Sequence, residues 1–320
     1  MNRREALKLA ALTATQTALP LVFAAQTSAP ILDAHIHLFN PTRPGGIPWP
    51  FPTDKILYKP ALPNRYAKIA QPFGIVGAIA IEASPLAADN DWLLDVAAKN
   101  SLIVGIIGNL NPAAPSYTSD LERLHRNPLF LGFRYGNLWN RDLFEDLQKP
   151  NFLEGLKALA QAGLVFESAN PDPKLIQALL KIANAIPDLR IVLDHLPNAK
   201  VPSEKAAQTE FAANLQELAK HKQVFVKLSE IPRLENGKLL TNLSAYQDSL
   251  DQIWNTFGED HILFGSDWPN SDTTAPFEQT MAIVRKYFAT KSPAARAKYF
   301  YKNSHAAYHW QARTPVQASV

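Results

Sequence analysis

Three histidines and one aspartate are placed where they could perform hydrolytic chemistry. His35 and His37 are two residues apart at the end of the first apolar run, and side chains at that spacing on a β-strand point to the same face, while the residues before and between them point to the other. His195 ends another apolar run, and Asp267 follows a third run and a glycine. Imidazole and carboxylate groups can move protons or hold a metal ion, so the sequence predicts a hydrolytic site.

Each of these residues also has a plain structural role open to it. His35 and His37 could be hydrogen-bonded core side chains, His195 could bind a loop carbonyl, and Asp267 could cap a loop or a helix. Their joint occurrence at the ends of predicted strands favours chemistry over coincidence.

The chain alternates short apolar runs with amphipathic stretches, which is typical of parallel α/β proteins. Eight strand-like runs favour a closed (β/α)8 TIM-like barrel over an open doubly wound sheet, because the histidine pair stands where such a sheet would have a Gly-rich phosphate turn. We expect one barrel domain over residues 30–312. The predicted strands are 31–38, 75–82, 102–108, 129–134, 163–167, 190–195, 223–228 and 261–266, with helices between them such as 91–99, 119–126, 151–162, 174–185, 207–221 and 244–257.

Polar side chains end most of these predicted strands. In a barrel of this kind, the carboxyl ends of all strands meet at one mouth, where active sites are built. The prediction therefore gathers seven residues around one axis: His37, Glu82, Arg134, Glu167, His195, Ser229 and Asp267.

Two arginines are candidates for binding an anionic substrate. Arg134 ends a predicted strand, and Arg233 follows shortly after another. A guanidinium group suits two-pronged recognition of a carboxylate. For Arg134, an internal ion pair with Glu82 or Glu167 is the alternative.

Aromatic side chains could cover and line the mouth. Residues 39–65 form a long irregular segment directly after the histidine pair, and its prolines and aromatic residues favour packing over the mouth as a lid. Trp139 and Trp268 could stack on a substrate ring, with burial in the core as the alternative.

Residues 1–25 have the features of an export signal. Arg3 and Arg4 give a basic start, a mildly apolar stretch follows, and small residues surround Ala24. The paired arginines indicate twin-arginine export, with general secretion as the alternative. The stretch 7–23 is too polar and too short for a membrane span, so we expect no stable membrane anchor and a periplasmic location.

Composition narrows the partners and the chemistry. With 47% hydrophobic and 19% charged residues, the chain has ordinary globular composition. The predicted leader carries +2 of the formal net charge of +3, which leaves about +1 and indicates no nucleic-acid partner. The absence of cysteine excludes thiol nucleophiles and zinc–thiolate sites. The sequence does not indicate an oligomeric state.

Six motifs, in order along the chain, resemble the amidohydrolase-related family, particularly its lactonases acting on 2-pyrone-4,6-dicarboxylate and on sugar acids. The resemblance extends from residue 30 to about residue 312. It implies a barrel hydrolase of amidohydrolase type that opens a small cyclic ester, either an anionic or a sugar-derived lactone. The motifs are Asp33-Ala34-His35-Ile36-His37, Leu131-Gly132-Phe133-Arg134, Val192-Leu193-Asp194-His195, Val226-Lys227-Leu228-Ser229, Gly265-Ser266-Asp267-Trp268-Pro269 and Asn303-Ser304-His305-Ala306.

The resemblance also implies roles for the site residues. His35, His37 and His195 would face the substrate carbonyl, and Asp267 would activate water. The cofactor is then either none or one Zn²⁺ held by His35, His37 and Asp267. The chain shows no obvious strand-end lysine to bridge two metals, so at most one ion is expected. We expect the metal-free cluster, because the predicted strand 223–228 has no histidine and because the resemblance is to lactonases, some of which work without metal.

Two other functions fit the same fold. One is a mononuclear zinc-dependent amidohydrolase or decarboxylase, and the other is a non-catalytic periplasmic barrel that binds a ligand. A binding protein would tolerate loss of the base, whereas this chain keeps Asp267 together with all three histidines. The sequence therefore favours an exported lactone hydrolase.

Overall fold

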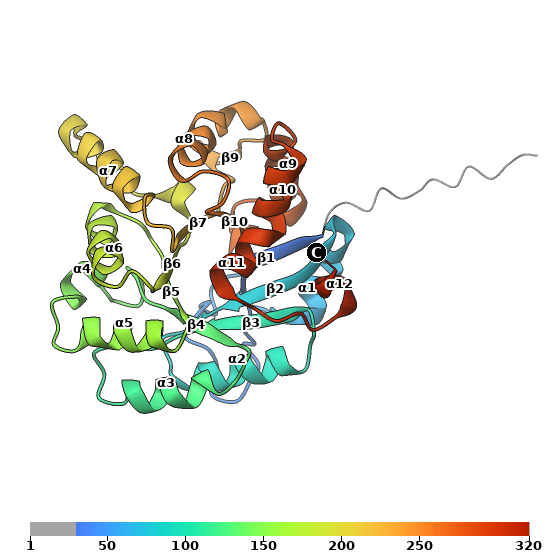
Figure 1. The fold of residues 1–320 in the computed structure, drawn as a ribbon. Helices are drawn as coiled ribbons and strands as arrows, with labels where there is room; N and C mark the ends of the chain where they lie inside the picture. The colour runs from blue at the N-terminus through green and yellow to red at the C-terminus, as the bar shows by residue number, and fades with distance from the viewer. Residues whose placement is uncertain (1–29, 320) are drawn as a thin grey trace, which may run out of the picture.

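The computed structural model of the protein describes residues 30–319, and its centre is an eight-stranded parallel sheet (Figure 1). Strands that are neighbours in the chain are neighbours in the sheet, in the order β1-β2-β3-β4-β5-β6-β7-β10. Their ends differ from the predicted ones by no more than two residues. The bounds are β1 (Ile31–His37), β2 (Ile75–Ile81), β3 (Ile103–Gly108), β4 (Phe130–Arg134), β5 (Val165–Ser168), β6 (Arg190–Leu193), β7 (Val224–Leu228) and β10 (Ile262–Phe264).

The first and last strands meet and close the sheet. The His37 amide donates to the Trp268 carbonyl at 2.7 Å, and the Asp267 amide donates to the His35 carbonyl at 2.8 Å. These bonds join β1 to the segment that follows β10, so the predicted (β/α)8 barrel is confirmed.

Helices cover the outside of the barrel, with α2, α3 and α5 along one side and α9 to α11 beside β1 and β10 (Figure 1). A short hairpin of β8 (Leu234–Glu235) and β9 (Lys238–Leu239) follows β7. The helices are α1 (Pro63–Ala70), α2 (Ala88–Ala98), α3 (Tyr117–His125), α4 (Leu143–Asp146), α5 (Phe152–Gln161), α6 (Pro173–Ala185), α7 (Lys205–Leu218), α8 (Gln247–Phe257), α9 (Phe277–Phe288), α10 (Pro293–Ala297), α11 (Asn303–Tyr308) and α12 (Pro315–Ala318).

Helix α6 illustrates how the local sequence places these helices. The Asp172 side chain caps the helix by accepting from the Leu175 amide at 2.8 Å, and Pro173 occupies the first turn, where its missing N–H costs no hydrogen bond. Leu175, Leu179 and Ile182 recur at helical spacing and are fully buried against the barrel. The same residues thus start the helix and fix the face that it packs.

The barrel interior is apolar at one end and polar at the other. The apolar layer consists of side chains from all eight strands: Leu32, Ala34, Ile79, Ile81, Val104, Ile107, Leu131, Val165, Val192, Phe225 and Leu263. Tyr308 and Trp310, from the end of the chain, pack on this layer. The polar residues lie beyond it, toward the carboxyl ends of the strands, so the core positions the site at the predicted mouth.

Strand β1 departs from simple alternation just before the histidine pair. Its register against β2 shifts between Asp33 and Ile36, which marks a β-bulge. Ala34 packs in the barrel interior and Ile36 in the outer core, while Asp33 turns outward and accepts a hydrogen bond from Tyr66 of α1 at 2.6 Å. The prediction that Ala34, the residue before His35, faces away from the barrel interior is therefore wrong.

None of the helices within residues 30–319 has the length and apolar character of a membrane span. The predicted leader, residues 1–25, lies outside the described residues.

Candidate active site

The four predicted catalytic residues converge on one point at the mouth of the barrel. The Oδ1 atom of Asp267 lies 3.2 Å from His37 Nε2, 3.4 Å from His35 Nε2 and 3.9 Å from His195 Nε2. This point forms the floor of a cavity of about 300 Å³, whose walls include His37, Trp49, Arg134, Trp139, His195 and Glu230. The structure thus brings together residues that are up to 232 positions apart in the sequence.

The backbone aims these side chains through unusual conformations. His195, Glu230 and Asp267 each follow a strand and each has a left-handed backbone, with φ of 53°, 51° and 59°. Non-glycine residues adopt this region rarely, and such positions concentrate at functional sites. Gly265 has a separate role, because a Cβ atom there would lie 2.7 Å from His35 Cβ and would displace that histidine.

Hydrogen bonds behind the site fix the imidazole and carboxylate orientations. The Nδ1 atom of His37 donates to the Ile81 carbonyl at 3.2 Å, and His195 Nδ1 lies 2.8 Å from the Ser229 hydroxyl. Asn270 donates to Asp267 Oδ2 at 2.7 Å. These contacts leave the Nε2 atoms and Asp267 Oδ1 facing the common point.

The converging atoms fit a single metal ion. Asp267 Oδ1 is buried and has no hydrogen-bond donor within the described residues, and the Nε2 atoms of His35 and His37 are 3.3 Å apart. Ligands about 2.0–2.1 Å from one tetrahedral zinc ion would be about 3.3–3.4 Å from each other. His195 stands close enough to His35 and Asp267 to act as a further ligand. His195 is thus a third imidazole at this point, while the strand 223–228 contributes no histidine.

Burial sets the protonation of the pair. It lowers the pKa of His35 well below the ordinary value and that of His37 to about 4, with the positive charges of Lys227 and Arg134 respectively as the next causes. Both imidazoles are therefore neutral near pH 7, which is the form that binds metal or exchanges hydrogen bonds.

A buried ion cluster supports His35 from inside the barrel. Lys227 Nζ lies 2.8 Å from Glu167 Oε1, 3.0 Å from Asp194 Oδ1 and 3.1 Å from His35 Nδ1. Tyr308 donates to the other oxygen of Glu167 at 2.6 Å. Burial and the neighbouring Asp194 raise the pKa of Glu167 to about 8, whereas Lys227 and His35 overcome the effect of burial and lower the pKa of Asp194.

Lys227 was not among the predicted site residues, although it lies on strand β7 and contacts His35. A signal existed in the alternation of β7, where Phe225 faces the barrel interior and Lys227 and Ser229 follow on the same face. Lys227 is fully buried in a strand of apolar residues, and a buried lysine requires partners.

Arg134 and Trp139 line the cavity, as predicted for substrate-binding residues, but both are bound to Glu82. The Nε atom of Arg134 donates to Glu82 Oε1 at 2.9 Å, and its Nη1 atom lies 3.4 Å from Asp194 Oδ2. The Trp139 indole N–H reaches both Glu82 oxygens, at 3.0 and 3.1 Å. The structure therefore shows the internal ion pair that was the alternative for Arg134.

The other two predicted substrate-binding residues are not at the cavity. Arg233 donates to the Ala245 carbonyl at 2.7 Å and lies over the Tyr246 ring. Trp268 is fully buried and packs on Tyr66, with ring centroids 5.2 Å apart. Arg233 is close to Ser229 in sequence and Trp268 is next to Asp267, but neither side chain lines the cavity.

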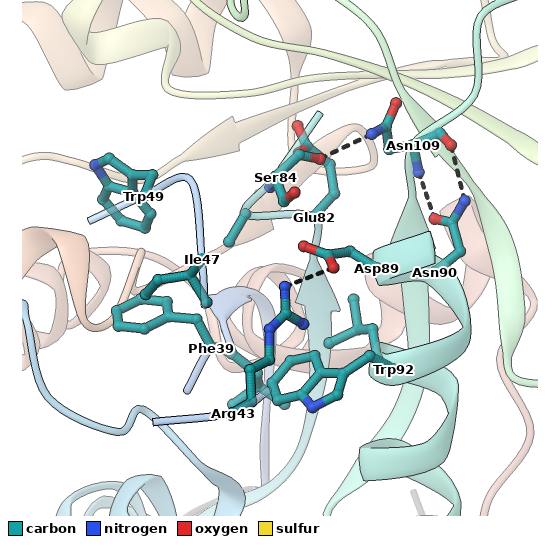
Figure 2. Close-up of a pocket in the computed structure, with 13 residues that line it drawn as sticks. Phe39, Arg43, Ile47, Trp49, Glu82, Ser84, Asp89, Asn90, Trp92 and Asn109 are labelled. Atoms are coloured by element: carbon teal, nitrogen blue, oxygen red, sulfur yellow. Dashed lines mark hydrogen bonds and ion pairs between the residues drawn. The ribbon is translucent and has the colours of Figure 1, made fainter. Parts of the chain in front are cut away.

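The segment after β1 covers one side of the cavity. Phe39 and Ala61 pair through backbone hydrogen bonds of 2.9 and 3.0 Å, which ties the ends of the loop together. Trp49 lines the cavity with its ring centroid 5.9 Å from that of His37. Figure 2 shows Arg43 of this segment pointing to Asp89 of α2, beside Trp92. The distance between Arg43 Nη2 and Asp89 Oδ1 is 2.6 Å. Packing over the mouth is thus observed, and α2 anchors it.

A second carboxylate, which the sequence analysis did not select, faces Asp267. Burial and then the charge of Glu230 raise the pKa of Asp267 well above its ordinary value. Burial alone would also raise the pKa of Glu230, but His195 and a hydrogen bond from Asn198 hold it below the usual value. The two acids are therefore inequivalent, which is common where one of them handles protons.

The chain is similar to known hydrolases over most of its length. A protein named L-fucono-1,5-lactonase from Burkholderia ambifaria is 28% identical over 248 residues, which are 77% of this chain and 82% of that protein. The structure of an amidohydrolase from Burkholderia multivorans with bound zinc matches with a TM-score of 0.76 at 21% identity, covering 88% of this chain and all of that one. A probable 2-pyrone-4,6-dicarboxylic acid hydrolase from Acinetobacter baumannii matches with a TM-score of 0.68 at 16% identity, covering 88% and 99%.

The two structural likenesses establish the fold, and the family follows from the sequence. The amidohydrolase family model matches residues 32–310. This range includes all four converging side chains and, apart from Ile31 at the start of β1, all eight strands of the barrel. The chain therefore belongs to the amidohydrolase family, and the protein is a hydrolase of that family.

Proposed function

We propose that the protein opens a small polar lactone, with Asp267 accepting a proton from the attacking water. The convergence of three imidazoles on Asp267 Oδ1 at the floor of a cavity carries this proposal. A lactone carbonyl fits this arrangement, because its hydrolysis needs a base for water and stabilisation of the charge that develops on oxygen. The relative named L-fucono-1,5-lactonase supports the choice of a cyclic ester.

Within this reaction, each residue acts at a defined atom. Asn270 holds Asp267 Oδ2, so Oδ1 is the atom left to receive the proton of water. Water adds to the carbonyl carbon, the bond to the ring oxygen then breaks, and the leaving oxygen takes up the proton that Asp267 received. His195 faces the same point at 3.9 Å from Asp267 Oδ1, with its other nitrogen fixed by Ser229.

As the alternative to this metal-free reaction, we propose that His35, His37, His195 and Asp267 hold one zinc ion, in which case Asp267 Oδ1 would be a ligand and not the free base described above. The support is the buried Oδ1 atom without a donor and a donor set of imidazoles and one carboxylate. When bound, the ion would supply Lewis-acid polarisation of the ester carbonyl.

A panel of aldono-1,4- and 1,5-lactones, pyrone carboxylates and open-chain esters tests this function, since ring opening releases a proton that an indicator reports. We expect turnover of at least one lactone, and Asp267→Asn should lower kcat by at least a hundredfold because an amide cannot take the water's proton. Asp248→Asn, on the exposed side of α8, is the matched control and should keep wild-type activity. A panel without any lactone turnover would contradict the proposal.

We also propose that the protein is exported through the leader at residues 1–25. The support comes from the sequence alone, in the paired arginines and the apolar stretch that follows them. Fractionation of a bacterial host should recover the protein from the periplasm, and Arg3→Lys together with Arg4→Lys should retain it in the cytoplasm if the twin-arginine route is used.

A further inference from the structure

The one arginine or lysine among the described side chains that line the cavity is already paired with carboxylates. Arg134 is the one arginine or lysine among the residues that line the cavity, all of which lie in the described part of the chain. Its guanidinium donates to the Glu82 side chain and to the Glu82 carbonyl, both at 2.9 Å, and contacts Asp194. A substrate carboxylate would have to compete with these bonds.

Glu82 is not free to release Arg134. Besides the guanidinium, its two oxygens accept the Trp139 indole N–H and the Ser84 backbone amide, the latter at 3.0 Å. With both oxygens occupied and 3% of the residue exposed, Glu82 remains the partner of Arg134 when a ligand enters.

Glu230 is the opposite case, a carboxylate at the cavity wall without a cationic partner in contact. Its oxygens accept from two amides, Asn198 at 2.6 Å and Asn270 at 3.1 Å, and the nearest basic group is His195 Nε2 at 3.9 Å. About a quarter of its side chain is exposed, and the residue lines the cavity. Its backbone, at φ of 51°, holds it in this place.

An amide-held carboxylate of this kind accepts hydrogen bonds from hydroxyl groups and repels other carboxylates. Because Arg134 is paired with Glu82 and Asp194, no arginine or lysine among the described residues of this wall offsets the repulsion from Glu230 in the metal-free site. We propose that Glu230 is a specificity-determining residue that selects neutral, polyhydroxylated lactones over lactones that carry a carboxylate. This inference rests on the proposed lactonase function.

A matched pair of substrates tests the proposal, for example D-glucono-1,4-lactone and D-glucaro-1,4-lactone, which share a ring and differ in a terminal CH₂OH or carboxylate. We expect the wild-type kcat/KM to favour the neutral member at least tenfold. Glu230→Gln should shrink this ratio by about tenfold, with most of the change in KM, because the amide keeps the shape and removes the charge. Glu122→Gln, on the exposed face of α3, is the control and should leave the ratio unchanged.

The possible failures are distinguishable. If the wild-type protein opens no lactone of the wider panel, the proposed function itself is wrong. If it opens lactones but Glu230→Gln leaves the ratio within threefold, or lowers both substrates equally, Glu230 does not select by charge.

Salt dependence of the wild-type protein gives a second test, which does not depend on a folded variant. Raising the ionic strength from about 0.01 to about 0.15 M shortens the screening length from about 30 to about 8 Å. KM for the carboxylate-bearing lactone should fall severalfold while KM for the neutral one stays constant. A KM for the carboxylate-bearing lactone that rises with salt would show attraction in place of repulsion and overturn the inference.

Discussion

Replacement of Lys227 by methionine tests whether the buried ion cluster holds the site together. Methionine fills a similar volume but removes the ammonium that contacts Glu167, Asp194 and His35 at 2.8–3.1 Å. Glu167 and Asp194 would then remain fully buried without the ammonium group, and the closest contacts left to them would be Tyr308 to Glu167 at 2.6 Å, His35 to Asp194 at 3.3 Å and Arg134 to Asp194 at 3.4 Å. Breaking a buried pair in this way costs about 3–5 kcal/mol.

The expected consequence is a large loss of thermal stability. In a domain of this size, 1 kcal/mol corresponds to roughly 2–4 °C, so the melting temperature of Lys227→Met should fall by about 6–20 °C. Differential scanning calorimetry measures this directly. Lys149→Met is the matched control, since Lys149 pairs with Asp146 at the surface with half of its side chain exposed, and such a pair contributes about 1 kcal/mol or less.

A double variant isolates the electrostatic cause. Asp194→Asn removes the buried carboxylate whose pKa Lys227 lowers, so adding it to Lys227→Met should recover at least about 1 kcal/mol. A melting temperature of Lys227→Met within about 2 °C of wild type, or no recovery in the double variant, would refute the reasoning from buried charge.

Three further predictions concern the metal, the cover of the cavity and the leader. Prolonged dialysis against a chelator should remove about one zinc ion per chain, measured by mass spectrometry, and lower the melting temperature; active protein without stoichiometric metal would contradict the zinc proposal. Arg43→Met should raise KM about fivefold, because it frees the segment that carries Trp49 from Asp89. Arg123→Met, which breaks an exposed ion pair with Asp91, is the control and should leave KM unchanged. If Arg43→Met and Arg123→Met have equal KM values, the contact with Asp89 does not affect substrate binding. Removal of residues 1–25 should leave the melting temperature unchanged, because the first strand begins at Ile31; a destabilised product would argue against a cleavable leader.

The positions of the strands, and with them the identity of the four converging residues, could be predicted because both depend on local patterns. Short apolar runs rich in β-branched residues mark buried strands wherever they occur, and the alternation with amphipathic helices indicates a barrel. In a barrel, a polar residue at a strand end points to the mouth whatever its neighbours are. His35, His37, His195 and Asp267 could therefore be gathered without knowledge of any contact.

The pairing of charges could not be predicted in the same way. Arg134 ends a strand as clearly as His195 does, yet Glu82 and Asp194, which are 52 and 60 residues away in sequence, determine that its charge is used internally. The sequence is consistent with an Arg134 guanidinium that is free and with one that is paired. Only the distances from Arg134 to Glu82 and Asp194 show that it is paired. Glu230 was not predicted as a site residue for the same reason, because its role depends on which charged groups from other strands are near it.

What the sequence by itself determined is the barrel and the chemical groups at its mouth, because strand and helix periodicities are properties of neighbouring residues. The tertiary structure decided the bulge that turns Ala34 inward, the burial of Trp268 against Tyr66, and the cluster around Lys227. These features depend on which side chains from distant strands come within hydrogen-bonding distance. Coulomb energies and packing vary steeply over such distances, whereas a sequence pattern fixes only which face of a strand a residue occupies.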